Sequence, residues 1–577
     1  MSNRALSQVP SFWDGALFEV KATALRMRRS AGDRFGRAAA HRHGKGHALA
    51  AAPVLASVSS ALWPRLAGER DRALTAGKIH NLRRALSHLD GIEVPAGRLF
   101  SFWRQIGRTT KRRGFVKGRE LREGCLIASI GGGLCQLSNA LYEAAVSAGF
   151  DIVERHGHSR VVPGSRASVG RDATVFWNYV DLRICSNAPF RIEASLRKGA
   201  LVVTLRGGAS PATCKDGDLR EEERLGANDC TSCGETDCHR HEAEQPLSPY
   251  GEEGPTAWLV DACWPEFSIL FAATARPEDA LFVPQRLRRS PRHAWPDGVV
   301  ASETCATLVA LRRALGLRQA PREGRALHDM LLRYDEALAR HYARKLSYLH
   351  THLVISQNLL PHLWRLGELQ GRSFDVLMVR HPMATLQAKL DAAKAYYPKS
   401  ITLGDFRAPD DIVEAESAAL DTARTLLTPH SGIAGADPAR TRHLDWIVPV
   451  ARDRIARGGK SILFPASVLA RKGAYALREA IRGLDLEVVV TGSAREHDGD
   501  FWGDSRVRPL ENGHWPVELA AVVLPALVEH EPRALLKALA HGLPVIATEE
   551  CGLAANHDVL KVPAFDSHSL RQQLLQL

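Results

Sequence analysis

Cysteine is scarce in this chain, with ten among 577 residues. Cysteines this sparse exclude a disulfide-stapled scaffold. A long hydrophobic run is also lacking, because the longest uncharged apolar stretch near the N-terminus, residues 48–64, contains Pro53 and three serines. Such a segment is a poor signal peptide and a marginal membrane span. The pair Arg28-Arg29 is followed by polar residues rather than an apolar region, so a twin-arginine signal is also disfavoured. We therefore expect a cytoplasmic protein.

The chain does have the composition of an ordinary globular protein. Hydrophobic residues make up 45% and charged residues 24% of it, which excludes a disordered, collagenous or coiled-coil protein. At roughly 100–200 residues per domain, this length predicts three or four domains.

The net charge of +12 is unevenly distributed. Residues 1–50 carry nine Lys or Arg against three Asp or Glu, so half of the surplus lies in the first 50 residues. A solvated basic arm is the simpler interpretation, and the alternative is a contact with phosphate groups or an anionic membrane. That alternative would place the protein at the periphery of the inner membrane. We expect no nucleic-acid partner.

The pattern of elements predicts five regions. A basic helical N-terminal region (1–75) precedes an α+β domain (76–207) and a cysteine-rich linker (208–255) without periodicity. Two α/β doubly wound domains (256–447 and 448–577) follow, since continuous apolar strands there alternate with helices, as in parallel sheets covered on both faces. The predicted parallel strands are Ala257–Asp261, Ser268–Ala272, Leu353–Ser356, Asp375–Val379, Ser461–Pro465, Glu487–Gly492, Ala521–Pro525 and Pro544–Thr548.

A candidate nucleophile lies in the α+β domain. Glycines 131–133 come directly before an amphipathic helix whose first turn holds Cys135, and the field at a helix start lowers the pKa of a thiol. His156 and His158 follow a predicted strand, and Asp172 precedes another. Cysteine, histidine and aspartate in this chain order are typical of thiol hydrolases. The alternative is that Cys135 is a small packing residue.

The same domain resembles a known family. The segments Lys78–Leu82, Gly91–Arg104, Gly131–Asn139 and Asn178–Arg183 together closely resemble the VanW family, which occurs in some vancomycin-resistance clusters. The resemblance implies a link to the cell envelope or peptidoglycan. One reading makes Cys135 the nucleophile of an amide hydrolase or transferase. The motif residues that carry over are Gly131, Gly132, Gly133, Cys135, Gln136, Ser138, His158, Asp172 and Asp181.

The linker contains a second constellation. Four cysteines lie within it, followed by His239 and His241. Four thiolates with a CxxC turn suit one tetrahedral structural zinc, and free or redox-active thiols or an iron–sulfur cluster are the alternatives. The predicted ligands are Cys214, Cys230, Cys233 and Cys238.

The last two regions resemble another family. Residues 461–548 are similar to the nucleotide-binding domain of retaining GT-B glycosyltransferases, and residues 414–431 to the end of that fold's acceptor domain. The resemblance implies that Lys472 and Gly473 hold the diphosphate of a nucleotide-sugar donor and that Glu529 holds a hydroxyl-bearing part of it. The physics is consistent, since a cation at a helix start binds phosphate.

Two departures from that pattern affect the prediction. Ser467 stands where these enzymes usually have an arginine, and Lys537 where they have a second glutamate. Arg471 or Arg533 could replace the lost cation, because guanidinium groups bind phosphate bidentately. We predict a retaining transferase that moves a sugar from a nucleotide-sugar onto a cell-envelope glycan or lipid-linked acceptor. The alternative is a non-catalytic protein that binds cell-wall intermediates.

Overall fold

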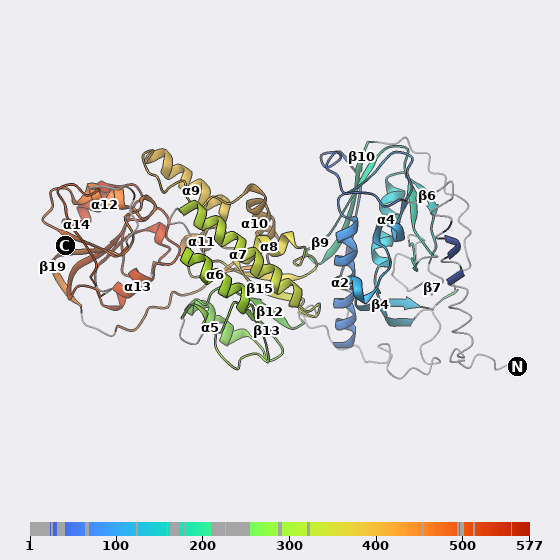
Figure 1. Cartoon of the computed structure of the whole chain (residues 1–577), viewed down its shortest axis with the longest axis horizontal. Coiled ribbons are helices and arrows are strands. Elements are labelled where there is room, and N and C mark those ends of the chain that lie inside the picture. Colours follow the sequence, from blue (N-terminus) through green and yellow to red (C-terminus); the bar gives the residue numbers. More distant parts are fainter. Residues whose placement is uncertain are drawn as a thin grey trace. The chain divides into compact units, whose positions relative to one another are not determined.

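The computed structural model describes residues 23–24, 27–29, 31, 41–63, 69–122, 125–157, 160–161, 172–177, 180–208, 225–226, 254–286, 291–319, 324–451, 455–492, 496, 501–511, 514–555 and 557–577. The chain forms two compact units (Figure 1). The first comprises Met1–Pro255 with the short segments Ser347–His352 and Gly367–Ser373. The second comprises Thr256–Leu346, Leu353–Leu366 and Phe374–Leu577.

The first unit is built on a four-stranded antiparallel sheet in the order β1-β10-β9-β2. Alternate residues of the two central strands are buried, as expected for a sheet with one face on the core. Two long helices pack against this sheet. The elements are β1 (Val54–Ala61), β2 (Ile92–Val94), β9 (Phe190–Arg197), β10 (Ala200–Gly207), α2 (Glu69–Leu89) and α4 (Cys135–Ser147).

Smaller elements of the first unit carry most of its motif residues. A three-stranded sheet has the order β3-β8-β6, and β4 pairs with β5 as an antiparallel hairpin that ends at the glycine loop. These elements are β3 (Phe100–Ser101), α3 (Phe102–Ile106), η1 (Lys111–Arg113), β4 (Lys117–Arg122), β5 (Cys125–Ile130), β6 (Asp151–Glu154) and β8 (Arg183–Cys185).

The helical prediction for residues 1–75 is wrong for Val54–Ala61, which forms strand β1. This strand pairs with β10 along its whole length, for example Val58 with Val203. Burial alternates along it, with Ala56 and Val58 facing the core. Long-range pairing with a strand that is distant in the sequence therefore decides the conformation here.

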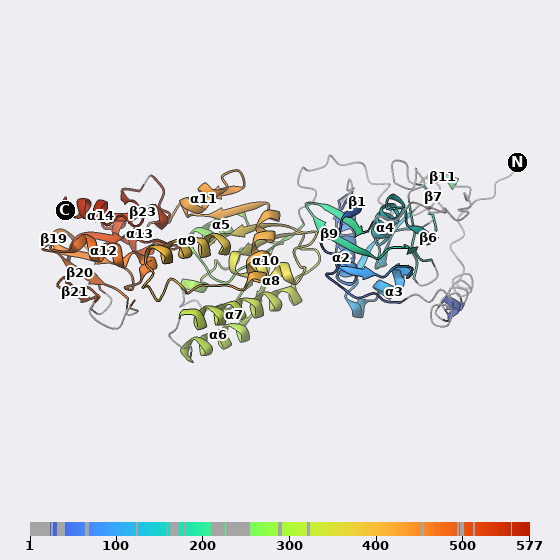
Figure 2. The same ribbon diagram turned by 90° about the horizontal axis from the view of Figure 1, so that it is seen from above.

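The second unit contains two lobes. In the first lobe, a seven-stranded sheet has the order β14-β13-β12-β15-β16-β17-β18. Figure 2 shows α6 and α7 side by side at the edge of this lobe. Its strands are β12 (Thr256–Leu259), β13 (Ala280–Val283), β14 (Ser302–Cys305), β15 (His352–Ser356), β16 (Ser373–Leu377), β17 (Thr425–Thr428) and β18 (Thr441–His443). Its helices include α5 (Pro265–Thr274), α6 (Thr307–Gln319), α7 (Gly324–Lys345), α8 (Leu360–Arg365), α9 (Met383–Tyr396), α10 (Asp410–Thr422) and α11 (Ser431–Ala436).

The second lobe has a six-stranded parallel sheet in the order β21-β20-β19-β22-β23-β24. The strand order reverses between β19 and β22, which makes this point the topological switch point of a doubly wound sheet. The elements are β19 (Ala456–Phe464), η6 (Ala470–Lys472), α12 (Ala474–Ile481), β20 (Glu487–Val490), β21 (Arg506–Pro509), β22 (Glu518–Leu524), α13 (Arg533–Ala540), β23 (Val545–Thr548), η7 (Glu549–Cys551), β24 (Leu560–Val562) and α14 (Ser567–Leu574).

The sheets of the first unit and the two lobes of the second confirm the prediction of an α+β domain followed by two doubly wound α/β domains. One predicted strand is wrong, because Ser268–Ala272 lies inside helix α5. Pro265 occupies the first turn of that helix, where its missing N–H costs nothing. Phe267, Leu270 and Phe271 are buried at the i, i+3, i+4 spacing of a helix. Within the described ranges, no helix is long and apolar enough to cross a membrane.

Candidate functional site

Two predicted donor residues meet at the switch point of the second lobe. Lys472 ends η6, in the connection after β19, and Glu529 lies in the connection after β22. The Lys472 Nζ is 2.6 Å from the Glu529 Oε2. The other carboxylate oxygen accepts hydrogen bonds from the backbone N–H groups of His530 (3.0 Å) and Glu531 (3.1 Å). A cation and an anion therefore lie where ligands of doubly wound sheets bind.

The surroundings keep Glu529 ionised. Burial alone would raise the pKa of the Glu529 carboxyl, but the charge and hydrogen bond of Lys472 and the two backbone N–H groups lower that pKa overall. Both side chains are largely covered, with 12% of Glu529 and 20% of Lys472 exposed. The pair is therefore a weakly solvated ion pair, in which a charged hydrogen bond is stronger than in water.

Gly473 fixes the backbone that carries Lys472. Its φ angle is +82°, and a Cβ atom at this position would lie 1.9 Å from the backbone oxygen of Pro525, directly after β22. Only glycine allows both the positive φ and this close approach. The close approach brings the connections after β19 and β22 together, and with them Lys472 and Glu529.

Three histidines surround this ion pair. His381 follows β16, His430 follows β17, and His530 is the residue after Glu529. Their ring centroids are 5.2 Å (381–430), 5.7 Å (381–530) and 6.4 Å (430–530) apart. The His430 Nε2 lies 3.0 Å from the Glu529 backbone oxygen. We call these three histidines with Lys472 and Glu529 the interlobe cluster.

The three histidines are neutral near pH 7. Burial lowers the pKa of all three histidines, and neighbouring cationic or histidine side chains also lower the pKa of His381 and His530. Together these effects bring the pKa of His381 to about 3. The Nε2 atoms of His381 and His530 are buried and have no hydrogen-bond partner among the described residues. The interlobe cluster therefore offers uncharged hydrogen-bonding groups of the kind that suit sugar hydroxyls.

A second ion pair borders the cluster. Lys389 on α9 contacts both carboxylate oxygens of Glu550 in η7, at 2.7 and 2.6 Å. The Glu550 Oε2 lies 3.9 Å from the His381 Nε2. Because α9 belongs to the first lobe and η7 to the second, this pair also links the lobes.

The other two predicted donor residues have different partners. Arg533 makes a bidentate ion pair with the fully buried Glu266 of α5, at 2.7 and 2.8 Å. Its guanidinium also lies over the rings of Trp264 (5.4 Å) and Trp446 (5.2 Å). Arg471 lies over the Phe406 ring at 4.8 Å, and burial lowers the pKa of its guanidinium. Arg533 therefore holds the lobes together.

The two departures from the GT-B pattern also have local explanations. Lys537, in place of the second glutamate, lies with its Nζ 4.3 Å from the centre of the Trp515 ring. Ser467, in place of the arginine, packs so closely against Gly492 that a Cβ there would lie 2.0 Å from the serine Oγ.

The first lobe has polar groups at its own switch point, between β12 and β15. Asn358 donates a hydrogen bond to Asp261 at 2.9 Å. Burial, followed by the charge of Asp261, raises the pKa of Asp335 to about 7. The nearest cation is Arg313, 3.9 Å away, and Arg313 lines a cavity of about 130 Å³ together with His293.

In the first unit, the predicted Cys–His–Asp residues have other partners. Cys135 begins helix α4, and its Sγ lies 3.8 Å from the Thr174 Oγ1. The fully buried Asp172 pairs with Arg155 at 3.0 Å. His156 contacts Glu154 at 3.3 Å, and His158 lies outside the described residues. A catalytic role of this trio stays a prediction.

The other motif residues hold the glycine loop in place. Gln136 donates to the Ser60 Oγ (2.9 Å) and the Ala61 backbone oxygen (2.8 Å), and Ser138 donates to the Ala173 backbone oxygen (2.6 Å). Gly133 has φ +97°, and a Cβ there would collide with the Lys78 side chain. These contacts explain the residue types without substrate.

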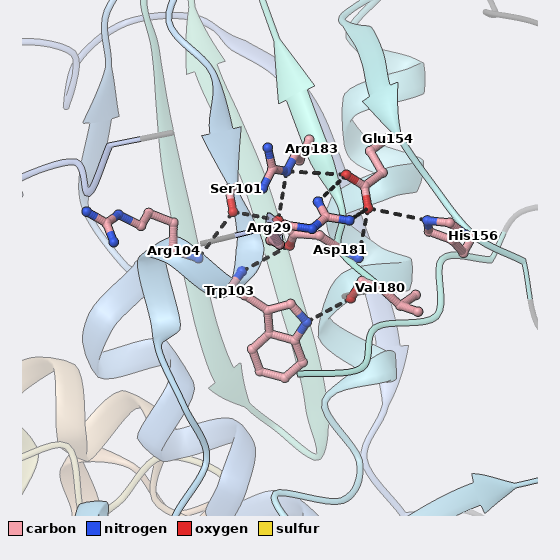
Figure 3. A network of polar contacts seen from close by, with 9 residues as sticks. All are labelled: Arg29, Ser101, Trp103, Arg104, Glu154, His156, Val180, Asp181 and Arg183. Atoms are coloured by element: carbon pink, nitrogen blue, oxygen red, sulfur yellow. Dashed lines mark hydrogen bonds and ion pairs between the residues drawn. The ribbon is translucent and has the colours of Figure 1, made fainter. Parts of the chain in front are cut away.

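Asp181 lies at the centre of a polar network (Figure 3). Its fully buried carboxylate accepts hydrogen bonds from the Ser101 hydroxyl (2.6 Å), the Trp103 backbone N–H (3.1 Å) and Arg183 (3.0 Å). Burial raises the pKa of Asp181 overall. Arg183 also lies 3.3 Å from Glu154. Asp181 therefore joins strand β8 to helix α3 and strand β3.

The predicted zinc ligands Cys214, Cys230, Cys233 and Cys238 lie outside the described residues, so zinc stays a prediction. Within the described part of the chain, no group of three or more His, Cys, Asp or Glu side chains could hold a metal ion.

Part of the first unit is similar to known proteins. Residues 77–206 match the family model described as VanW like protein. This chain is 35% identical over 128 residues to the uncharacterized protein YoaR of Bacillus subtilis (strain 168). It is 33% identical over 119 residues to the vancomycin B-type resistance protein VanW of Enterococcus faecalis (strain ATCC 700802 / V583). These matches cover 22% and 20% of this chain and 42% of each relative, so the chain spans less than half of the relatives it matches.

Solved structures are similar over another part of the chain. A lipopolysaccharide outer core galactosyltransferase, WaaB, is 11% identical with a TM-score of 0.32, covering 55% of this chain and 89% of that one. An alpha,alpha-trehalose-phosphate synthase (UDP-forming) from Burkholderia vietnamiensis is 11% identical with a TM-score of 0.33, covering 56% and 91%. Our fold assignment rests on the strand order of the two sheets.

Sequence reasoning did not single out several residues of this region. His381, Lys389 and Glu550 were not predicted, and His430 and His530 were read only as parts of longer motifs. A usable signal existed for His381 and Glu550, since each follows the carboxyl end of a predicted parallel strand within a few residues, whereas strand β17 before His430 was not predicted.

Proposed function

We propose that the second unit is a glycosyltransferase that takes its sugar from a nucleoside diphosphate sugar. The observation that supports this most is the Lys472–Glu529 pair at the switch point of the six-stranded sheet. An ammonium group suits the diphosphate, and a carboxylate and neutral imidazoles suit hydroxyls of the sugar or ribose.

The proposed reaction uses these groups as follows. Lys472 carries three N–H donors and uses one on Glu529, so the others can bind the diphosphate. The bond between the sugar C1 and the phosphate oxygen breaks while a bond from C1 to the acceptor oxygen forms. The acceptor hydroxyl proton passes to the leaving phosphate, as expected for a retaining transferase. Lys472 stabilises the negative charge that develops on the diphosphate.

We infer that the acceptor approaches from the first lobe, where Asp261, Asn358 and Asp335 lie at the switch point. The name of the VanW relative, a vancomycin resistance protein, supports a cell-envelope glycan or a lipid-linked saccharide as that acceptor. This chemistry would place the protein in the cytoplasm or at the inner face of the membrane.

Donor binding can be tested with the full chain and a panel of nucleoside diphosphate sugars carrying different bases and sugars. We expect one donor class to raise the melting temperature. Lys472→Gln should weaken that binding about 10- to 100-fold, the worth of a hydrogen bond to a charged group. Lys460→Gln is the matched control, because Lys460 also pairs with a carboxylate, that of Asp485, but is 71% exposed.

Two outcomes would contradict the proposal. One is that no donor in the panel binds, and the other is that Lys472→Gln binds a donor as tightly as Lys460→Gln. If a donor binds but no acceptor preparation from bacterial envelopes receives sugar, the non-catalytic alternative holds. Lys537 favours that alternative, because it stands in the place of the usual second glutamate and lies against Trp515.

A further inference from the structure

A basic pocket lies in the first unit, away from the motif cysteine. It has a volume of about 340 Å³ and is lined mainly by Arg42, His43, Lys45, Ser87, His88 and Gln105. These residues come from three places: the segment before β1, the last turn of α2, and helix α3. We call this site the basic pocket.

Positive charge accumulates around the basic pocket. Arg42 and Lys45 line it, and Arg113 lies against His88. Arg84 precedes His88 by one helical turn. Among the described residues, no ion pair involves any of these four cations. Burial, followed by the charges of Arg113, Arg42, Arg84 and Lys45, lowers the pKa of His88. In the part of the chain that the structure describes, no carboxylate therefore pairs with these cations.

The hydrogen bonding of His88 is mismatched. Its Nδ1 lies 3.2 Å from the Arg42 Nη2, and its Nε2 lies 3.3 Å from the Arg113 Nη2. A neutral imidazole has one N–H and one acceptor nitrogen, whereas a guanidinium only donates. In either tautomer, one of the two contacts therefore sets a donor against a donor. An anion between the groups would accept from both and remove the mismatch.

Hydrogen bonds to the backbone fix the walls of the basic pocket. The Gln105 amide donates to the backbone oxygens of His43 (3.1 Å) and His88 (2.7 Å) and accepts from the His43 N–H (2.9 Å), while only 2% of Gln105 is exposed. Arg113 donates to the backbone oxygens of Ile106 (2.7 Å) and Arg108 (2.8 Å). These contacts therefore fix the backbone on both sides of the pocket, at His43 and His88, before any ligand arrives, which reduces the cost of binding.

We propose that the basic pocket binds a phosphate-bearing anion of diphosphate size. The lining residues Arg42, Lys45 and His88 offer donors that suit the several oxygens of a phosphoryl group, and Arg113 adds positive charge behind His88. The volume of about 340 Å³ is at the lower end of small-ligand sites. The phosphoryl group can come from a soluble diphosphate or from an anionic lipid headgroup. This site does not depend on the proposed transferase.

The experiment uses the full chain carrying Lys472→Gln, so that the interlobe cluster does not contribute. Calorimetry with inorganic diphosphate, at constant ionic strength set with chloride, should show one binding event. Arg42→Ala/Lys45→Ala should weaken it at least tenfold, since each lost charged donor is worth about tenfold or more. Arg312→Ala/Arg318→Ala removes the same charge from exposed positions on α6 and should bind diphosphate unchanged.

Vesicles distinguish the two sources of phosphate. Binding to phosphatidylglycerol but not phosphatidylcholine vesicles, lost in Arg42→Ala/Lys45→Ala and kept in the control, would assign a lipid headgroup. Diphosphate binding without vesicle binding would assign a soluble phosphate ligand. The proposal is overturned if diphosphate has no effect beyond that of chloride, or if the two double variants bind it equally.

Discussion

The ion pair between Arg533 and Glu266 should be worth far more than its counterparts on the surface. The Glu266 side chain is fully buried, and its remaining described contact is a hydrogen bond from the Ile447 backbone N–H at 2.8 Å. Arg533→Ala would leave that carboxylate buried without its counter-ion. Removing one partner of a buried pair costs roughly 3–5 kcal/mol. The loss of two cation–π contacts, roughly 0.5–1 kcal/mol each, adds to the effect.

The second unit also contains a matched control. Arg365 and Asp411 form an ion pair of 3.0 Å in the same unit, but they are 47% and 59% exposed. Arg365→Ala should lower the free energy of unfolding by at most about 1 kcal/mol, as is typical of exposed pairs. Both variants remove the same side chain and the same charge, so the difference between them measures the combined effect of burial and of the cation–π contacts of Arg533.

Urea unfolding followed by tryptophan fluorescence measures both variants. Trp264 and Trp446 lie directly against Arg533 and report on its surroundings. A double variant, Glu266→Gln/Arg533→Met, should recover much of the lost stability, because no unpaired charge is then buried. Equal losses for Arg533→Ala and Arg365→Ala would refute the reasoning.

Three further predictions concern single groups. Asp335 has a pKa of about 7 in the fold and of about 3.9 when the chain is unfolded. Ionising this carboxyl should therefore lower the free energy of unfolding by roughly 4 kcal/mol as the pH rises from about 4 to about 7. In pH-dependent denaturation, Asp335→Asn should abolish this loss. Burial would raise the pKa of Glu154, but hydrogen bonds from His156 and Arg29 and nearby charges lower this pKa to about 2. The free energy of unfolding should therefore fall less steeply between about pH 4 and 2 in Glu154→Gln than in the unchanged protein. At pH 7 this variant should be roughly 2 kcal/mol less stable. Gly133→Ala should destabilise the first unit in thermal melts by about 1 kcal/mol more than Gly199→Ala, since both glycines have positive φ but a Cβ at Gly199 meets no atom within 4 Å; a smaller effect at Gly133 would argue against the collision with Lys78.

Sequence periodicity was sufficient for most central strands of the second unit, such as β15, β22 and β23, because these strands are largely apolar and buried. The strand at Ala257–Asp261 could be predicted in this way, whereas Ser268–Ala272 could not, since a short apolar run does not distinguish a buried helix from a strand. Strand β1 was missed for another reason. Its partner β10 is distant in the sequence, and its serines and alanines carry little strand propensity of their own.

The site was predictable where a residue type is tied to a strand end. Lys472, Gly473 and Glu529 satisfy that condition, and the structure brings them together. The contact of Arg533 with Glu266 could not be predicted, because the two residues lie 267 positions apart in the sequence. Similarly, nothing in the sequence indicates that Asp172 pairs with Arg155, a contact that depends on how two loops pack.

The Lys472–Glu529 pair also bears on ligand choice. Because the ammonium group already has an anionic neighbour 2.6 Å away, a simple phosphate ion entering the site would be repelled by the carboxylate as well as attracted by the lysine. A ligand that brings hydroxyl groups together with its phosphates would satisfy the carboxylate and the cation at once. In the proposed donor site, the glutamate would thus select against bare anions abundant in a cell and favour molecules in which sugar and phosphate are joined.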